Sequence, residues 1–105
     1  MAEAVVDEVI ALLRARPALR WLHVPDSRQL PGNPGFPDFI VVGPGGVIFR
    51  EAKPHPGARL RPGQTGWSYA LMAAGADFAL WYPEDLANGS VGRELDQLAN
   101  PAASP

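Results

Sequence analysis

Residues 38–53 read DFIVVGPGGVIFREAK, two segments rich in β-branched and aromatic residues around a Gly-Pro-Gly-Gly turn. Such segments favour strands, and a glycine-rich turn between them favours direct reversal of the chain. The stretch therefore predicts a β-hairpin whose arms run from Asp38 to Val42 and from Val47 to Lys53.

The register of this hairpin decides which side chains meet. If the first and last glycines of the turn face each other, Asp38 falls directly opposite Glu51, with Cβ atoms about 4.5–5.5 Å apart. Because side chains alternate along a strand, Lys53 projects from the same face as Glu51. A register shifted by one residue would instead place Phe39 opposite Glu51 and separate the two acids.

Two carboxylates that face each other favour a cation between them. Without a cation they repel, and each raises the pKa of the other. Mg²⁺ prefers oxygen ligands, and it can activate a bound water and neutralise charge on a phosphate. Lys53, the only lysine in the chain, is a compact cation suited to position that water or to stabilise developing negative charge. The alternative is that Glu51 and Lys53 form an exposed ion pair on an edge strand.

Hydrophobic periodicity and turn residues predict the remaining elements. In order, the sequence predicts a helix over residues 2–15, a strand over 21–24, a loop over 25–37, the hairpin, a helix opened by Pro62 and closed by Gly75, a strand over 77–82 and a helix over 91–98. This order, α-β-β-β-α-β-α, predicts an α/β fold in which helices flank a mixed β-sheet.

Length and composition indicate one globular domain. The chain has 105 residues, of which 47% are hydrophobic and 19% charged, and no cysteine, which excludes disulfides and thiolate zinc sites. We expect residues 1–99 to form the domain and residues 100–105 to form a flexible tail. No apolar run is long enough to span a membrane, and no basic region of a secretory signal is present at the N-terminus. A cytoplasmic location is therefore expected.

Basic residues gather near the hairpin, although the formal net charge is −2. Arg50, Lys53, Arg59 and Arg61 lie in one stretch that contains a single acid. A local basic patch can hold phosphate even when the total charge is slightly negative. Arg28, Arg59 and Arg61 are therefore candidate contacts to nucleic-acid phosphates, and ordinary surface arginines are the alternative.

Three spaced motifs surround the hairpin: GFPD at residues 35–38, FREAK at 49–53 and LRPGQ at 60–64. With Trp67 and Leu71 following in order, they resemble the VRR-NUC family of nucleases, which belongs to the PD-(D/E)XK, restriction-endonuclease-like superfamily. The similarity covers nearly the whole chain and is greatest to stand-alone phage and bacterial members. It implies a restriction-endonuclease-like fold.

The resemblance also implies a metal centre that contains Mg²⁺ or Mn²⁺. Asp38, Glu51 and the backbone carbonyl of Ala52 would bind the metal, Lys53 would be the catalytic lysine, and Gln64 would be the family's glutamine at the edge of the site. The family also uses a glutamate from its first helix.

Glu3 fits that glutamate best, because it lies on one helical stripe with Val6 and Ile10. The alternative is an N-terminal acid that interacts favourably with the helix dipole.

The activity implied by the resemblance is hydrolysis of DNA phosphodiesters, in structure-specific members at branched DNA or four-way (Holliday) junctions. A homodimer is expected, because phage members resemble dimeric enzymes and a lone small domain has little surface for gripping DNA. The cell would be a bacterium or a phage-infected host. The alternative is a non-catalytic DNA-binding or assembly module that keeps this fold.

Overall fold

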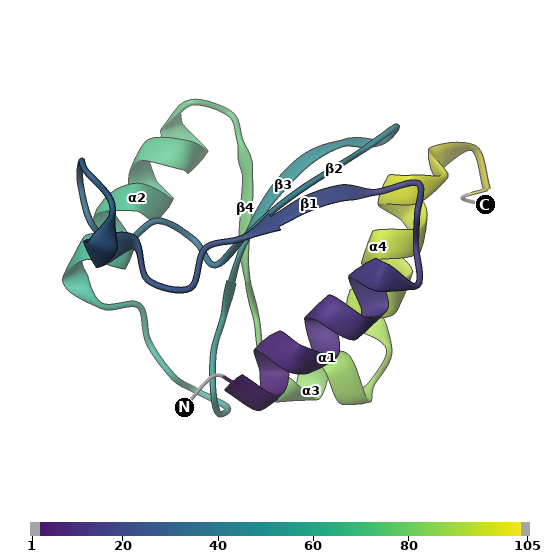
Figure 1. The fold of residues 1–105 in the computed structure, drawn as a ribbon, viewed down its shortest axis with the longest axis horizontal. Helices are drawn as coiled ribbons and strands as arrows, with labels where there is room; N and C mark the ends of the chain where they lie inside the picture. Colours follow the sequence, from purple (N-terminus) through teal and green to yellow (C-terminus); the bar gives the residue numbers. More distant parts are fainter. Residues whose placement is uncertain (1–2, 104–105) are drawn as a thin grey trace.

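Four strands form one mixed sheet within residues 3–103, the part of the chain that the computed structural model describes (Figure 1). Their order in the sheet is β1-β2-β3-β4, with β3 and β4 parallel and the other neighbours antiparallel. The elements, with η for a 3-10 helix, are α1 (Glu3–Arg14), β1 (Arg20–His23), η1 (Ser27–Gln29), β2 (Phe39–Gly43), β3 (Gly46–Ala52), α2 (Pro62–Ala73), β4 (Asp77–Trp81), α3 (Pro83–Ala87), α4 (Ser90–Ala99) and η2 (Pro101–Ala103). The expected mixed α/β sheet with flanking helices is confirmed.

The hairpin of β2 and β3 has the register that brings the two acids together. Gly43 pairs with Gly46, and Phe39 pairs with Arg50, so the register shifted by one residue is not the one adopted. Gly46 has a φ of +129°, a backbone conformation that residues other than glycine rarely adopt. Extending this register by one residue places Asp38, which precedes β2, opposite Glu51.

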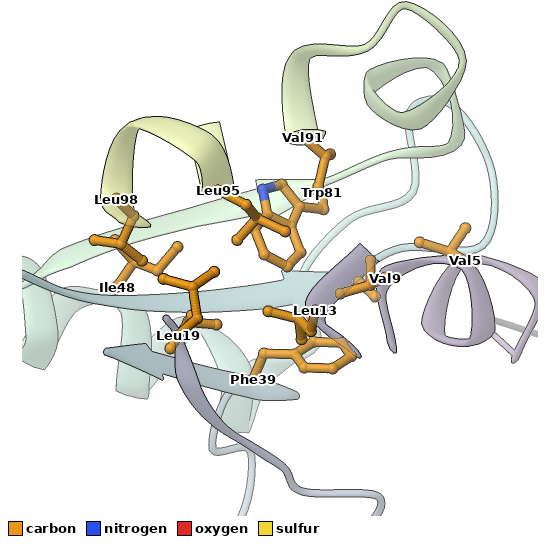
Figure 2. Packing of buried hydrophobic residues seen from close by; sticks show 12 residues of the cluster. Val5, Val9, Leu13, Leu19, Phe39, Ile48, Trp81, Val91, Leu95 and Leu98 are labelled. Carbon is orange, nitrogen blue, oxygen red and sulfur yellow. The ribbon is translucent and has the colours of Figure 1, made fainter. Parts of the chain in front are cut away.

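The sheet separates α2 from the other helices: α2 lies on one side, and α1, α3 and α4 lie on the other (Figure 1). The main core fills the second side, where the apolar stripe of α1 and the inward residues of α4 meet the sheet (Figure 2). Buried residues of this core include Val9, Leu13, Phe39, Trp81 and Leu95. The i, i+4 spacing of the α1 residues is what places them on one stripe.

Arg50 faces this core, on the opposite side of β3 from Glu51. It is buried, and its guanidinium pairs with Glu94 of α4 at 2.8 Å and with Asp77 at 3.0 Å. The indole N–H of Trp81 donates to the same Glu94 carboxylate at 2.7 Å. The grouping of Arg50 with the basic patch in the sequence is therefore wrong, because adjacent strand residues point to opposite faces.

Three short helices, η1, α3 and η2, add to the predicted order. Pro83 ends β4, as expected, but it also occupies the first turn of α3, and the Asp85 carboxylate accepts the Tyr82 N–H at 2.9 Å. The order is therefore α-β-β-β-α-β-α-α. Within the expected loop over 25–37, Asp26 caps η1 by accepting the Arg28 N–H at 3.0 Å.

The expected flexible tail over 100–105 contains η2, and its last two residues lie outside the described part of the chain. No helix within residues 3–103 is long and apolar enough to cross a membrane.

Candidate active site

Glu51 and Lys53 are buried at the end of a central strand, with only 4% and 5% of their surface exposed. β3 lies between β2 and β4, and the Lys53 N–H donates to the Trp81 carbonyl at 2.9 Å. The alternative of an exposed ion pair on an edge strand is therefore wrong. Burying an acid and an amine is costly unless both are bound, so their partners define the site.

Gln64, in the first turn of α2, binds both of these ionic side chains. Its amide nitrogen donates to Glu51 Oε2 at 2.8 Å, and its amide oxygen accepts Lys53 Nζ at 2.8 Å. The same oxygen accepts the backbone N–H of Arg61 at 2.9 Å. Lys53 Nζ itself lies 3.8 Å from Glu51 Oε2. One amide therefore joins the hairpin to α2 and holds the amine beside the carboxylate.

Asp38 completes the group from the start of β2. Its Oδ2 accepts the backbone N–H of Ala52 at 2.8 Å. Burial raises the pKa of Asp38 above its ordinary value, and this effect outweighs the lowering by the Ala52 N–H and by nearby Glu51, His23 and Lys53. The hairpin thus brings its two acids together as the sequence predicts.

The pKa of Glu51 is raised from 4.5 to about 8, first by burial and then by the neighbouring Asp38 charge. The positive charge of Lys53 opposes this rise without cancelling it. Near neutral pH the two carboxyl groups therefore favour a shared proton, or a cation that replaces it.

A hard divalent cation fits these donors. Asp38 and Glu51 each offer a carboxylate, and one oxygen of each is already held by an N–H group of Ala52 or Gln64. Within residues 3–103 no group of three or more His, Cys, Asp or Glu side chains could hold a metal. Two carboxylates suffice for Mg²⁺, which usually keeps several waters and takes further oxygens from a substrate phosphate.

A cleft of about 960 Å³ opens beside these acids, between α1, the end of β1 and the loop over residues 54–61. We call it the large cleft. Glu3, the predicted first-helix acid, is exposed and lines the large cleft. Glu3 does not join a three-residue cluster with Asp38 and Glu51 in the described structure.

His23 also lines the large cleft, and its ring lies 4.9 Å from that of Phe39. Its charge lowers the pKa of Asp38, so the imidazole lies within electrostatic reach of that carboxylate. Sequence reasoning did not select His23 as a site residue. The one available signal was its position at the end of the strand that precedes the loop to Asp38.

Tyr82 is a residue that sequence reasoning did not select. Its hydroxyl donates to the Ala58 carbonyl at 2.9 Å and so holds the loop over residues 54–61 at the wall of the large cleft.

The three candidate arginines differ in their surroundings. Arg59 and Arg61 are exposed on the large cleft, and neither forms an ion pair with another described residue. Arg28 lines the same cleft but is bound to Asp26 by two hydrogen bonds of 3.0 and 3.1 Å. That pair lowers the pKa of Asp26 to about 2. Much of the positive charge of Arg28 is therefore already compensated.

Comparisons with known proteins identify the fold. No protein-family model and no curated protein matches the sequence. Among solved structures, a chain described as "VRR_NUC domain" is similar, with a TM-score of 0.66 and 19% sequence identity. The likeness covers 84% of this chain and 91% of that chain. At this identity it concerns the fold, and it agrees with the motifs around the hairpin. The chain therefore has the fold of a VRR_NUC domain.

Proposed function

We propose that the chain is a metal-dependent deoxyribonuclease that hydrolyses phosphodiester bonds. The observation that carries this proposal is the group of Asp38, Glu51, Lys53 and Gln64 beside an open cleft. Burying two acids and an amine together contributes little to stability, and strongly shifted pKa values of this kind gather at functional sites. The VRR_NUC fold supports the same reading, because nuclease activity is what that family is named for.

Asp38, Glu51 and the carbonyl of Ala52 would hold a Mg²⁺ or Mn²⁺ ion. When bound, such an ion polarises a phosphodiester and makes a nearby water more acidic. The two carboxylates supply the negative charge that holds it, and the Ala52 and Gln64 N–H groups fix their orientation. Glu3 is a further candidate ligand from the opposite wall of the cleft.

Lys53 would position the attacking water and stabilise charge that develops on the phosphate. Its ammonium carries three donors, of which Gln64 uses one. Gln64 in turn orients the ammonium, whose ion pair with Glu51 is long, at 3.8 Å. Attack of water on phosphorus with release of the 3′ oxygen would leave a 5′-phosphate.

Arg59 and Arg61 would contact backbone phosphates on either side of the scissile one. Both are exposed on the large cleft and form no ion pair with another residue in the described part of the chain, which suits sequence-independent contact. The overall charge of −2 makes such local arginines the main electrostatic attraction for DNA. Branched DNA, including four-way junctions, is the proposed substrate class.

A second copy of the chain is the proposed protein partner. The sheet face that carries α2 exposes Leu22, Val42 and Val47, and α2 itself exposes Tyr69 and Met72. Exposed apolar patches of this kind often form interfaces. Light scattering that gives only the monomer mass, with and without DNA, would refute this part of the proposal.

The function is tested by cleavage of labelled linear, flapped and four-way-junction DNA with Mg²⁺, with Mn²⁺ and with EDTA. We expect metal-dependent cutting by the wild type and none by Lys53→Ala. The charge-matched control is Arg14→Ala, an exposed cation at the end of α1 that lies outside both the site and the cleft.

Mn²⁺ binding by calorimetry separates the nuclease from the non-catalytic module. The proposal expects binding that Asp38→Ala abolishes and Lys53→Ala retains. Weak Mn²⁺ binding that survives Asp38→Ala, with no cutting by folded wild type on any DNA, would instead favour the non-catalytic module.

A further inference from the structure

A second cavity of about 340 Å³ lies between the loop before β2 and the start of α2. We call it the side pocket. Its volume is within the range of about 300–1,000 Å³ that is typical of small-ligand sites. Pro25, Arg28, Asp38 and Arg61 line both the side pocket and the large cleft, so the two spaces adjoin at Asp38. A group in the side pocket would therefore lie next to whatever the acids act on.

The side pocket is preformed, because its loop is fastened to itself and to α2. The Ser27 hydroxyl accepts the N–H groups of Gly35 at 2.7 Å and Phe36 at 3.1 Å. Gly35 packs so closely on Gly63 of α2 that a Cβ atom on Gly35 would clash with the Gly63 carbonyl carbon. A ligand entering this pocket therefore loses little affinity to ordering the protein.

The walls of the side pocket, which combine polar and apolar residues, suit a flat ligand with a polar edge. Phe36 lines it, and its ring is fixed edge-to-face against Trp67 at 4.8 Å and Phe49 at 6.2 Å. Both lone pairs of the Ser27 hydroxyl oxygen accept backbone N–H groups of the loop. No described residue accepts the hydroxyl hydrogen. One hydrogen-bond donor is therefore left in a pocket with an aromatic wall.

The charges in the side pocket favour a neutral ligand over a phosphate. Two acids, Asp26 and Asp38, line it together with two arginines, Arg28 and Arg61. The bidentate bond to Asp26 compensates the charge of Arg28 and fixes its guanidinium plane. A fixed guanidinium plane is a surface on which nucleobases stack. Arg61, which has no such partner in the described structure, remains available for a phosphate at the mouth.

We propose that the side pocket receives one unpaired nucleobase of the DNA, from the nucleotide next to the scissile phosphate. This inference rests on the proposed nuclease function and deepens it. A base in a duplex must break its pairing and stacking to enter, whereas a base at a flap, bulge or junction is already free of this cost. The pocket therefore selects DNA with an unpaired nucleotide beside the cut.

The test measures Kd by fluorescence anisotropy for three DNAs: a paired duplex, the duplex with one unpaired adenine, and the same bulge with an abasic residue. Lys53→Met protein with Mg²⁺ keeps the acids and prevents cutting, and wild type in EDTA is the parallel measurement. We expect the unpaired base to improve affinity by about five- to tenfold over the abasic site, as one base stack does.

Arg28→Ala should erase that difference, since Arg28 is 76% exposed and its loss does not disturb the core. The matched variant Arg59→Ala, on the large cleft but outside the side pocket, should weaken binding to all three DNAs by the same factor. Equal Kd values for the base and the abasic site, or an Arg28→Ala effect equal on all three DNAs, would overturn the pocket assignment.

Failure of the pocket assignment and failure of the nuclease proposal are distinguishable. Wild-type cleavage of the same DNAs without any effect of the base would leave the nuclease and remove the subsite. Absence of both binding and cleavage would remove both.

Discussion

In the absence of divalent ions, the protein should become less stable as the pH rises from 5 to 8. Glu51 has a pKa of about 8 in the folded chain against 4.5 for the free side chain. Between these values the folded state holds a proton that the unfolded state has released, so unfolding becomes easier with each pH unit. Asp38, whose pKa is also raised, acts in the same direction.

The magnitude follows from one proton. The slope is about 1.4 kcal/mol per pH unit between pH 5.5 and 7.5, and the whole shift from 4.5 to about 8 corresponds to roughly 5 kcal/mol. Asp26, the strongly paired acid with a pKa of about 2, titrates below this window and does not offset it.

The assay is urea unfolding in EDTA at half-unit steps from pH 5 to 9, for wild type and Glu51→Gln. Glutamine keeps the shape but carries no titrating proton, so the slope should shrink to what Asp38 contributes. Added Mg²⁺ should restore stability most at high pH, because it binds the deprotonated acids. Stability that is flat or rises from pH 5 to 8, or an unchanged slope in Glu51→Gln, would refute the reasoning.

Three further substitutions probe the framework around the site. Arg50→Ala removes the buried guanidinium that Glu94 and Asp77 share, and because both acids are partly exposed to water, urea unfolding should show a loss of about 1–3 kcal/mol; a loss well under 1 kcal/mol would contradict it. Gly35→Ala, at a φ of +98° and with its Cβ against Gly63, should lower the midpoint of thermal unfolding, whereas Gly32→Ala, whose Cβ meets open space although its φ is +112°, should lower it less. Tyr82→Phe loses the bond to Ala58, about 1 kcal/mol, and amide exchange over residues 54–61 should quicken; unchanged exchange would argue against the tether.

The sequence predicts the hairpin and its acids well because two local rules agree there. The glycine turn sets the register, and strand alternation decides which face each side chain takes. The position of Asp38 opposite Glu51 can therefore be predicted without information from distant residues. The same alternation places Arg50 on the core face, but its linear position next to Glu51 suggested a shared basic patch. Charge counted along the chain does not distinguish the two faces of a strand.

The remaining features depend on contacts between distant segments. The burial of Lys53 follows from Gln64 reaching across from α2, and no local pattern records that contact. The pairing of Arg28 with Asp26 is local, yet only the docking of the loop on α2 makes it a wall of a pocket. The short helix α3 was missed because proline at the end of a strand and proline at the start of a helix look alike in sequence.

The bonds from α4 to the hairpin have a consequence for the order of synthesis. The turn N–H of Gly45 donates to the Leu98 carbonyl at 2.9 Å, and Glu94 supplies the partner that buried Arg50 needs. On the ribosome, both hairpin strands emerge long before these partners do. A nascent chain lacking residues 94–98 would leave Arg50 with Asp77 but without Glu94, and part of the core uncovered. The buried face of the hairpin should therefore complete its ion pairs and its packing only after α4 has been synthesised.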